Sequence, residues 1–325
     1  MRLLGRLILG VILILFVIAG IAFGYDFYAS SRVLEEYPPQ GSIISINGID
    51  THVICQGEGE ETLVLFHGFA GGAIDMIPLM NALETEMQVC SFDRPGNDYA
   101  SAIPANWTMA DSLAWHNAVI AIIAEGSAPI AENAIGSSQS LNLATEVYVA
   151  GHSLGEAYAL AYAAEYPVSG IISLDGLSPE IADTVVARMG TYANLKLLAQ
   201  LGLLRPISGN FAAPEYDETL SAQMVALRSR SQNIAGFADE GSFVSENLTT
   251  EALTAAVDLL DIPMLIFAAE QTSVAEGQAF TDSLIALDAN YAQSELITVP
   301  DARHYLIVTH ADLLAENIIE WINAQ

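Results

Sequence analysis

The sequence predicts an α/β fold built on a mainly parallel, eight-stranded sheet with helices on both faces. Eight short β-rich runs alternate with helical segments, which is typical of βαβ units. Several runs, such as residues 62–66, are continuously apolar, as expected for strands buried on both faces. Strand character disappears over residues 177–260, which predicts a helical lid inserted between two strands.

The chain begins with an apolar segment. Residues 7–23 carry no charge, Arg2 and Arg6 precede them, and Asp26 follows. This length is at the lower end for a membrane-spanning helix, and the arginines predict a cytoplasmic N-terminus with the rest of the chain outside. Alternatives are a cleaved signal peptide, which would leave a secreted protein, and a buried core helix.

We therefore expect residues 1–24 to be a membrane anchor or signal segment, and residues 25–41 to be a polar spacer that ends at Pro38-Pro39. The first strands follow around Asn47-Gly48, a dipeptide that favours a tight hairpin turn. The eight expected strands occupy residues 42–46, 51–55, 62–66, 88–92, 146–150, 170–174, 263–267 and 295–299.

Helices are expected between most of these strands. One runs over residues 107–125 and opens with Thr108 as its N-cap and Asp111 three positions later. A long polar loop is expected over residues 127–145. The remaining helices are expected before Leu83 and over residues 156–165, 192–204, 219–230, 278–287 and 311–323. Residues 42–176 and 261–325 would then form the core, and residues 177–260 the lid.

The composition excludes nucleic acid as a partner. Ten basic residues stand against 39 acidic ones, which gives a net charge of −29. An anionic surface repels phosphates, and the chain has no basic stripe to offset that repulsion. Attachment to a membrane through a polybasic patch is excluded for the same reason.

The chain has two cysteines, Cys55 and Cys90, both in expected strands. Two cysteines are too few for a disulfide scaffold, and they are not spaced as metal ligands. We expect two buried free thiols, or a bridge if the two strands are neighbours in an oxidising compartment.

Residues 151–155 read Gly-His-Ser-Leu-Gly, a G-x-S-x-G pattern between a β-rich run and a helical run. In that setting a serine is held on a sharp, strained turn with its hydroxyl exposed. The two glycines fit because a side chain at either position would collide with the neighbouring strand or helix. The pattern predicts that Ser153 is a nucleophile; the alternative is a glycine-rich turn with an incidental serine.

A serine hydroxyl needs a base that takes its proton, and a histidine oriented by a carboxylate is the usual arrangement. His304 follows the strand at residues 295–299, so it should lie at the sheet edge that carries Ser153. We predict that His304 is the base. The turn at residues 67–70, His-Gly-Phe-Ala, follows a neighbouring strand, and its Phe69 N–H with the Leu154 N–H would form the oxyanion hole.

The carboxylate partner has two candidates. Asp175 ends the strand at residues 170–174, and Glu270 follows the strand at residues 263–267. The latter place is the usual one for the acid, but it holds no aspartate here. We favour Asp175 and keep Glu270 as the alternative.

Taken in order, five segments resemble the α/β-hydrolase superfamily from about Ile43 to the C-terminus. They are His67-Gly68-Phe69, residues 91–96, the 151–155 elbow, Leu174-Asp175 and Arg303-His304. The resemblance is to the serine, lipase/esterase-like branch, because branches such as the dehalogenases carry an aspartate where Ser153 stands. It implies a Ser–His–acid hydrolase with a helical cap. Two departures are Glu156, at a place usually taken by glycine, and the missing aspartate near Gln271.

The sequence thus predicts a membrane-anchored serine hydrolase that cleaves a carboxylic ester, or an amide, through an acyl-enzyme. The apolar stretch at residues 195–204 and the nearby membrane favour a lipophilic substrate. The expected chemistry needs neither a metal nor an organic cofactor. Alternatives are a non-catalytic binding protein on the same fold, and an acyltransferase or peroxidase-like member.

Overall fold

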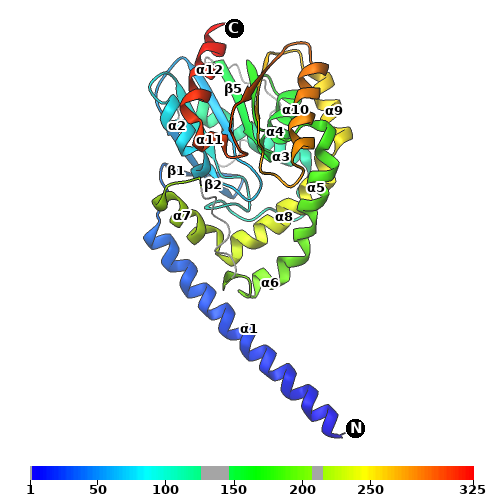
Figure 1. Cartoon of the computed structure of the whole chain (residues 1–325). Helices are drawn as coiled ribbons and strands as arrows, with labels where there is room; N and C mark the ends of the chain where they lie inside the picture. Colours follow the sequence, from blue (N-terminus) through cyan, green and yellow to red (C-terminus); the bar gives the residue numbers. More distant parts are fainter. Residues whose placement is uncertain (1, 126–145, 207–214) are drawn as a thin grey trace.

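The structure, a computed structural model, describes residues 2–125, 146–206 and 215–325. The polar loop expected at residues 127–145 lies outside the described residues. A mainly parallel sheet of eight strands lies at the centre of the body, and helices cover both of its faces (Figure 1).

The strands follow the order β1-β2-β4-β3-β5-β6-β7-β8 across the sheet. β1 and β2 are antiparallel to each other, β2 is antiparallel to β4, and every other neighbouring pair is parallel. This confirms the predicted fold class. The strand bounds are β1 Ser42–Ile46, β2 Ile49–Gln56, β3 Glu61–Phe66, β4 Gln88–Phe92, β5 Glu146–His152, β6 Gly170–Leu174, β7 Met264–Ala269 and β8 Ser294–Val299.

The core lies in two hydrophobic clusters, one on each face of the sheet. Successive residues of β3 alternate between them: Val64 and Phe66 join one cluster, and Leu63 and Leu65 join the other. The period of two along a strand sends neighbouring side chains to opposite faces. The first cluster also contains residues of α3 (Met109–Ala124), α4 (Leu154–Glu165) and α10 (Gln278–Asn290). The second contains residues of η1 (Ala73–Met76), α2 (Ile77–Leu83), α11 (Leu306–Thr309) and α12 (Ala311–Asn323).

Local sequence signals place several element ends. Asn47 and Gly48 both have positive φ, 51° and 77°, and they form the two-residue turn between β1 and β2. Thr108 caps α3 by accepting the Asp111 N–H, and the Asp111 carboxylate accepts the Thr108 N–H in return. Both features were predicted from the sequence.

Residues 177–260, here called the helical insert, separate β6 from β7 along the chain, and the described elements of the insert lie at the carboxyl edge of the sheet (Figure 1). A single helix expected over residues 192–204 is wrong: a 3₁₀ turn precedes a short α-helix, and that helix ends before Gly202, whose φ is 72°. The described elements are η2 Pro179–Ile181, α5 Ala182–Gly190, η3 Thr191–Leu195, α6 Lys196–Gln200, α7 Glu218–Arg228, α8 Ser231–Asn247 and α9 Thr250–Leu259.

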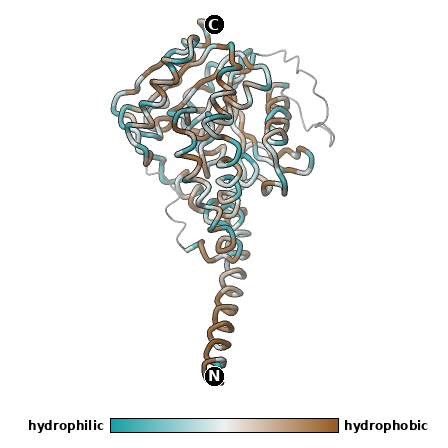
Figure 2. The backbone as a smooth tube through the Cα atoms, turned by 90° about the vertical axis from the view of Figure 1, so that its right-hand side faces the viewer, coloured by the Kyte–Doolittle hydropathy of each residue, from teal (hydrophilic) through white to brown (hydrophobic). Residues whose placement is uncertain are grey.

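The N-terminal helix α1 runs over Arg2–Glu36 and projects from the body, and most residues of its outer part are hydrophobic (Figure 2). It is long and apolar enough to cross a membrane. The helix continues past residue 24, so the polar segment expected as a spacer is helical as far as Glu36. Residues 2–36 contain no proline and no two adjacent glycines, so the helix continues until Glu36, just before Pro38-Pro39.

The two cysteines form a disulfide between neighbouring strands. Cys55 of β2 and Cys90 of β4 are directly paired residues of the antiparallel ladder. Our default expectation of two buried free thiols is therefore wrong. Strand order decided this outcome, since β2 pairs with β4 rather than with β3.

Candidate active site

Ser153 occupies the turn between β5 and α4 with φ 55° and ψ −124°, a backbone conformation that non-glycine residues rarely adopt. The flanking glycines allow this turn. A Cβ on Gly151 would lie 2.2 Å from the Glu156 backbone nitrogen, and a Cβ on Gly155 would lie 2.1 Å from the Phe66 carbonyl oxygen. Any side chain at either position would therefore displace the backbone.

His304 and Asp175 come together from two different loops. The His304 Nδ1 lies 2.7 Å from the Asp175 Oδ2, and both side chains are buried. An Nδ1–H that donates to the carboxylate leaves the Nε2 of His304 as the proton acceptor. Ser153 and His304 line the same cavity, so the structure brings the three predicted residues to one edge of the sheet.

Asp175 is held by more than the histidine. Its Oδ1 accepts the Ala269 N–H at 3.0 Å, and its Oδ2 accepts the Thr272 hydroxyl at 2.9 Å. Both donors belong to the end of β7 and the turn after it, which is where the family pattern usually has the acid. The carboxylate of Asp175 thus reaches the usual location from the neighbouring strand, β6.

Glu270 lies elsewhere. Its side chain is exposed, and its Oε2 accepts the N–H of Asp301 at 2.8 Å. It shapes the turn that leads to His304, and no interaction between Glu270 and His304 is among the hydrogen bonds of the described residues.

The loop that holds Phe69 lies directly against the elbow, since a Cβ on Gly68 would lie 3.3 Å from the Ser153 Cβ. Arg94 holds this loop in place, because its guanidinium donates hydrogen bonds to the carbonyl oxygens of His67 (2.5 Å) and Gly68 (2.9 Å). The Phe69 and Leu154 N–H groups therefore belong to two segments that meet at Ser153.

Arg94 also reaches the helical insert. Its Nε donates to the Glu240 Oε1 of α8 at 2.8 Å, and both side chains are almost completely buried. Its guanidinium lies over the Tyr158 ring, 4.6 Å from the ring centroid. The other oxygen of Glu240 accepts the Ala70 N–H at 3.3 Å, so this carboxylate joins the insert to the loop that holds Phe69.

Glu156 is fully buried at the start of α4, and its Oε2 accepts the Ser173 hydroxyl at 2.7 Å. Burial raises the pKa of Glu156 to about 8, so the carboxyl group is neutral at pH 7. A Cβ on Gly176 would lie 1.6 Å from that same oxygen. The glutamate thus fills the space beside the backbone that carries Asp175, where a glycine would leave room.

His152 supports His304 from the elbow. Burial lowers the pKa of His152 to about 3, so the ring is neutral. Its Nε2 lies 2.9 Å from the His304 carbonyl oxygen, which can only accept, so the Nε2 carries the proton. This contact ties the loop that holds His304 to the turn that holds Ser153.

A cavity of about 570 Å³ opens above Ser153 and His304. Most of its wall is apolar and comes from the helical insert and the Phe69 loop. The large apolar lining residues are Phe69, Tyr192, Leu195, Leu204, Ile234, Phe237, Val274 and Tyr305. Such a wall favours a substrate with a hydrocarbon part.

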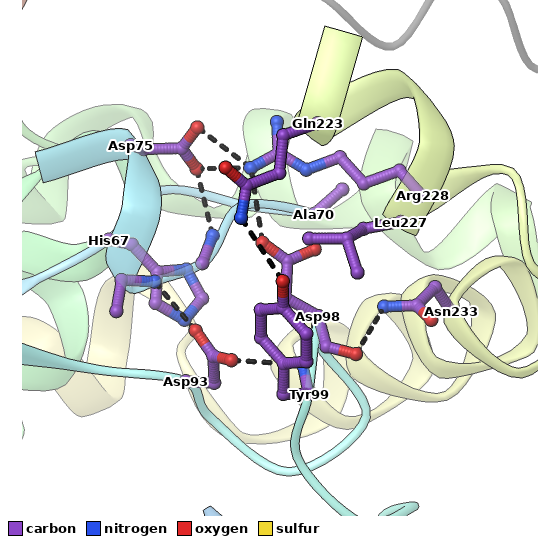
Figure 3. A network of polar contacts seen from close by, with 12 residues as sticks. His67, Ala70, Asp75, Asp93, Asp98, Tyr99, Gln223, Leu227, Arg228 and Asn233 are labelled. Atoms are coloured by element: carbon purple, nitrogen blue, oxygen red, sulfur yellow. Dashed lines mark hydrogen bonds and ion pairs between the residues drawn. The ribbon is translucent and has the colours of Figure 1, made fainter. Parts of the chain in front are cut away.

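Charged groups line another part of the cavity. Arg228 of α7 donates to both oxygens of Asp75 at 2.7 Å and lies 3.5 Å from an oxygen of Asp98 (Figure 3). Burial raises the pKa of Asp98 to about 7. The contacts of Arg228 with Asp75 and Asp98 form a second connection between the insert and the core, in addition to the pair of Arg94 with Glu240. This second connection lies next to the loop that holds Phe69.

Sequence reasoning missed Glu240, Arg228 and Thr272, which act through partners more than 90 residues away in the chain. No local pattern marks such residues. Among the residues that the structure describes, no cluster of His, Cys, Asp and Glu side chains has the arrangement of a metal site.

The sequence model of the Alpha/beta hydrolase family matches residues 63–317, so the chain belongs to this family. A search of curated proteins found no match.

Solved structures with the same fold include a candidate lipase from Acinetobacter baumannii, with 17% identity and a TM-score of 0.62 over 92% of this chain and 96% of that chain. A carboxylesterase structure from Nitrososphaera gargenis has 13% identity and a TM-score of 0.62 over 87% and 98%. The enol-lactonase from Burkholderia xenovorans has 16% identity and a TM-score of 0.59 over 87% and 100%. At these identities the likeness establishes the fold alone.

Proposed function

We propose that this hydrolase is a serine esterase in which Ser153 is the nucleophile, His304 the base and Asp175 the acid. The observation that carries the proposal is the 2.7 Å contact between His304 and Asp175 beside a serine whose backbone has φ 55°. Strained backbone of this kind persists where the surrounding structure enforces it, which is common at active sites.

This geometry supports the following reaction. The Ser153 Oγ attacks the ester carbonyl carbon, and the Nε2 of His304 takes the hydroxyl proton. The Phe69 and Leu154 N–H groups stabilise the negative oxygen of the tetrahedral intermediate. Its collapse releases the alcohol, which takes the proton from His304. Water, activated by His304, then hydrolyses the acyl-Ser153 ester and frees the acid.

Asp175 keeps the His304 Nδ1–H in place and stabilises the imidazolium that forms in each step. The hydrogen bonds from Ala269 and Thr272 hold the carboxylate in the orientation in which it accepts from His304. Glu270 has no part in the proposed mechanism, since its carboxylate is engaged with the Asp301 backbone.

The apolar cavity wall supports an ester with a hydrophobic acyl or alcohol part as the substrate. We also propose that α1 anchors the protein, with the catalytic domain on the extracytoplasmic side and the helical insert acting as a lid. The Cys55–Cys90 disulfide supports that side, because disulfides persist in oxidising compartments.

A fluorophosphonate probe tests the nucleophile, because it reacts only with an activated serine. We expect the full-length protein to be labelled at Ser153, and Ser153→Ala to be unlabelled with unchanged thermal stability. Equal labelling of both proteins would contradict the assignment. An unlabelled but folded wild type would instead favour a non-catalytic binding protein. Acyl transfer to an added alcohol in preference to water would favour an acyltransferase.

A further inference from the structure

The structure places one face of the helical insert beside α1. A Cβ on Gly202 would lie 2.7 Å from the Ala22 carbonyl oxygen, so the chain just after α6 touches α1 at that level. Arg205 then pairs with Asp26 at 2.7 Å and donates to the Ser30 hydroxyl at 3.1 Å. These contacts fix the direction in which α1 leaves the body (Figure 1).

The contact between Gly202 and Ala22 lies at the position along α1 where the surface of a membrane is expected. Residues 3–23 rise about 31 Å as a helix, close to the thickness of the bilayer hydrocarbon core. The side chains that follow, Tyr25, Phe27 and Tyr28, are exposed aromatics of the kind found at the boundary between hydrocarbon and water. Ala22, and with it Gly202, lies at the edge of the hydrocarbon core.

The insert is apolar at this level. Beyond residue 37, seven large hydrophobic side chains of the described chain are exposed, and four of them lie in residues 192–198. These four are Tyr192, Leu195, Leu197 and Leu198. Exposed leucines gathered on one short segment indicate a contact surface rather than chance exposure.

The charge of this segment fits a lipid surface. The chain has 39 acidic residues, yet none lies in residues 191–205 or in residues 1–25. The single lysine of the chain, Lys196, also lies in this segment, and its Nζ pairs with the Asp239 Oδ1 of α8 at 2.6 Å, so it neutralises an acidic side chain beside the segment. The acidic surface elsewhere would be repelled by anionic lipids.

The same segment forms part of the cavity wall. Tyr192 and Leu195 line the cavity above Ser153, and Leu197 and Leu198 do not. Residues 192–198 therefore contribute side chains to the cavity wall and also exposed leucines that are available for contact with a bilayer.

We propose that residues 191–200 rest in the surface of the bilayer that α1 crosses, and that the cavity receives a lipid ester from that bilayer. The docking depends on α1 being retained as an anchor. The substrate part rests on the ester hydrolysis proposed above.

Site-directed fluorescence tests the docking. Both native cysteines are in the disulfide, so Leu197→Cys supplies the only free thiol for an environment-sensitive fluorophore. The full-length protein is placed in phosphatidylcholine nanodiscs, and its mass is measured first to show that α1 is retained. Leu259→Cys is the matched control, because Leu259 is 72% exposed, Leu197 is 66% exposed, and α9 lies at the far end of the body from α1 (Figure 1).

We expect a nitroxide-labelled phospholipid to quench the fluorophore at position 197 at least about threefold more than at position 259. Equal quenching at the two positions would overturn the proposal. Shielding at position 197 that appears only with two chains in one disc would assign the surface to a second copy of the chain, and would overturn it too.

Hydrolysis tests the substrate part. The double variant Leu197→Asp/Leu198→Asp should cleave monoolein in phosphatidylcholine vesicles at least about tenfold more slowly, because charged side chains would replace the two exposed leucines of the proposed bilayer contact. Its rate on soluble p-nitrophenyl acetate should stay within about twofold, and Leu259→Asp should change neither rate. Equal losses on both esters would contradict delivery from the bilayer. A wild type that cleaves neither ester would refute the proposed function, while the quenching result would still decide the docking.

Discussion

The edge of the sheet that carries Ser153, Asp175 and His304 is here called the catalytic edge after its proposed role. This edge and the helical insert are held in different ways. Seven non-glycine residues of the described chain have positive φ, and four of them, Ala70, Ser153, Asp175 and Asp301, lie at or next to the catalytic edge. The described part of the insert has none. The catalytic edge is thus set by backbone conformations that the sheet enforces.

The insert instead depends on side-chain contacts. Glu240 of α8 pairs with Arg94, and Arg228 of α7 pairs with Asp75, so two buried ion pairs join it to the core. A third pair, Arg205 with Asp26, joins it to α1. The difference teaches that backbone conformation positions Ser153 and Asp175, whereas side-chain contacts between residues far apart in the chain position the cavity wall that the insert provides.

The largest expected effect tests the catalytic edge. Asp175→Asn should lower kcat by about 10⁴-fold with little loss of stability, because an amide no longer fixes the Nδ1–H tautomer of His304. The measurement is ester hydrolysis by the purified full-length variant.

Glu270→Gln is the matched control, since Glu270 contacts the Asp301 backbone rather than His304. Its kcat should stay within about twofold of the wild type. The reverse ranking of the two variants would show that the acid is Glu270, and that the carboxylate at the end of β6 has only a structural role.

A smaller effect tests how the insert is attached. Glu240→Leu leaves the Arg94 guanidinium buried without its carboxylate, which should lower the free energy of unfolding by about 3–5 kcal/mol. Denaturant titration measures this loss. Adding Arg94→Leu to the variant should restore part of it, since the unpaired charge is removed.

Asp239, the preceding residue on α8, offers a control. It pairs with Lys196, whose side chain is 44% exposed, so Asp239→Asn should cost less than about 1 kcal/mol. Similar costs for Glu240→Leu and Asp239→Asn would mean that the buried pair does not hold the insert to the core.

A last effect is gradual and concerns the pH dependence of stability, which involves the buried carboxyl group of Glu156 next to the Ser153 turn. Burial raises the pKa of Glu156 from 4.5 to about 8, so the folded state keeps a proton that the unfolded state releases. The stability that this proton contributes is fully present below pH 4.5 and is lost as the pH rises toward 8. The slope is at most about 1.4 kcal/mol per pH unit.

Glu156→Gln removes the titration and keeps an oxygen that can accept the Ser173 hydroxyl. Its free energy of unfolding, relative to the wild type, should therefore rise between pH 5 and pH 8, and denaturant titrations at several pH values measure this. Parallel pH profiles for the two proteins would show that Glu156 is ionised in the folded state.

The sequence by itself determined the order of the strands along the chain, the hairpin at Asn47-Gly48, the cap at Thr108 and the glycine-flanked turn at Ser153. Each depends on local physics: hydrophobic periodicity, turn conformation, or the space that a missing Cβ leaves. Such signals lie within a few residues of one another, so they can be read without knowing the fold.

Only the tertiary structure decided which groups meet across the sheet. Asp175 rather than Glu270 contacts His304, because β6 lies beside β7 and the turn after β7 donates to the Asp175 carboxylate. The Cys55–Cys90 bridge likewise depends on β2 pairing with β4. These contacts join residues far apart in the chain, and their partners follow from the order of strands in space, which hydrophobic patterns along the chain do not specify.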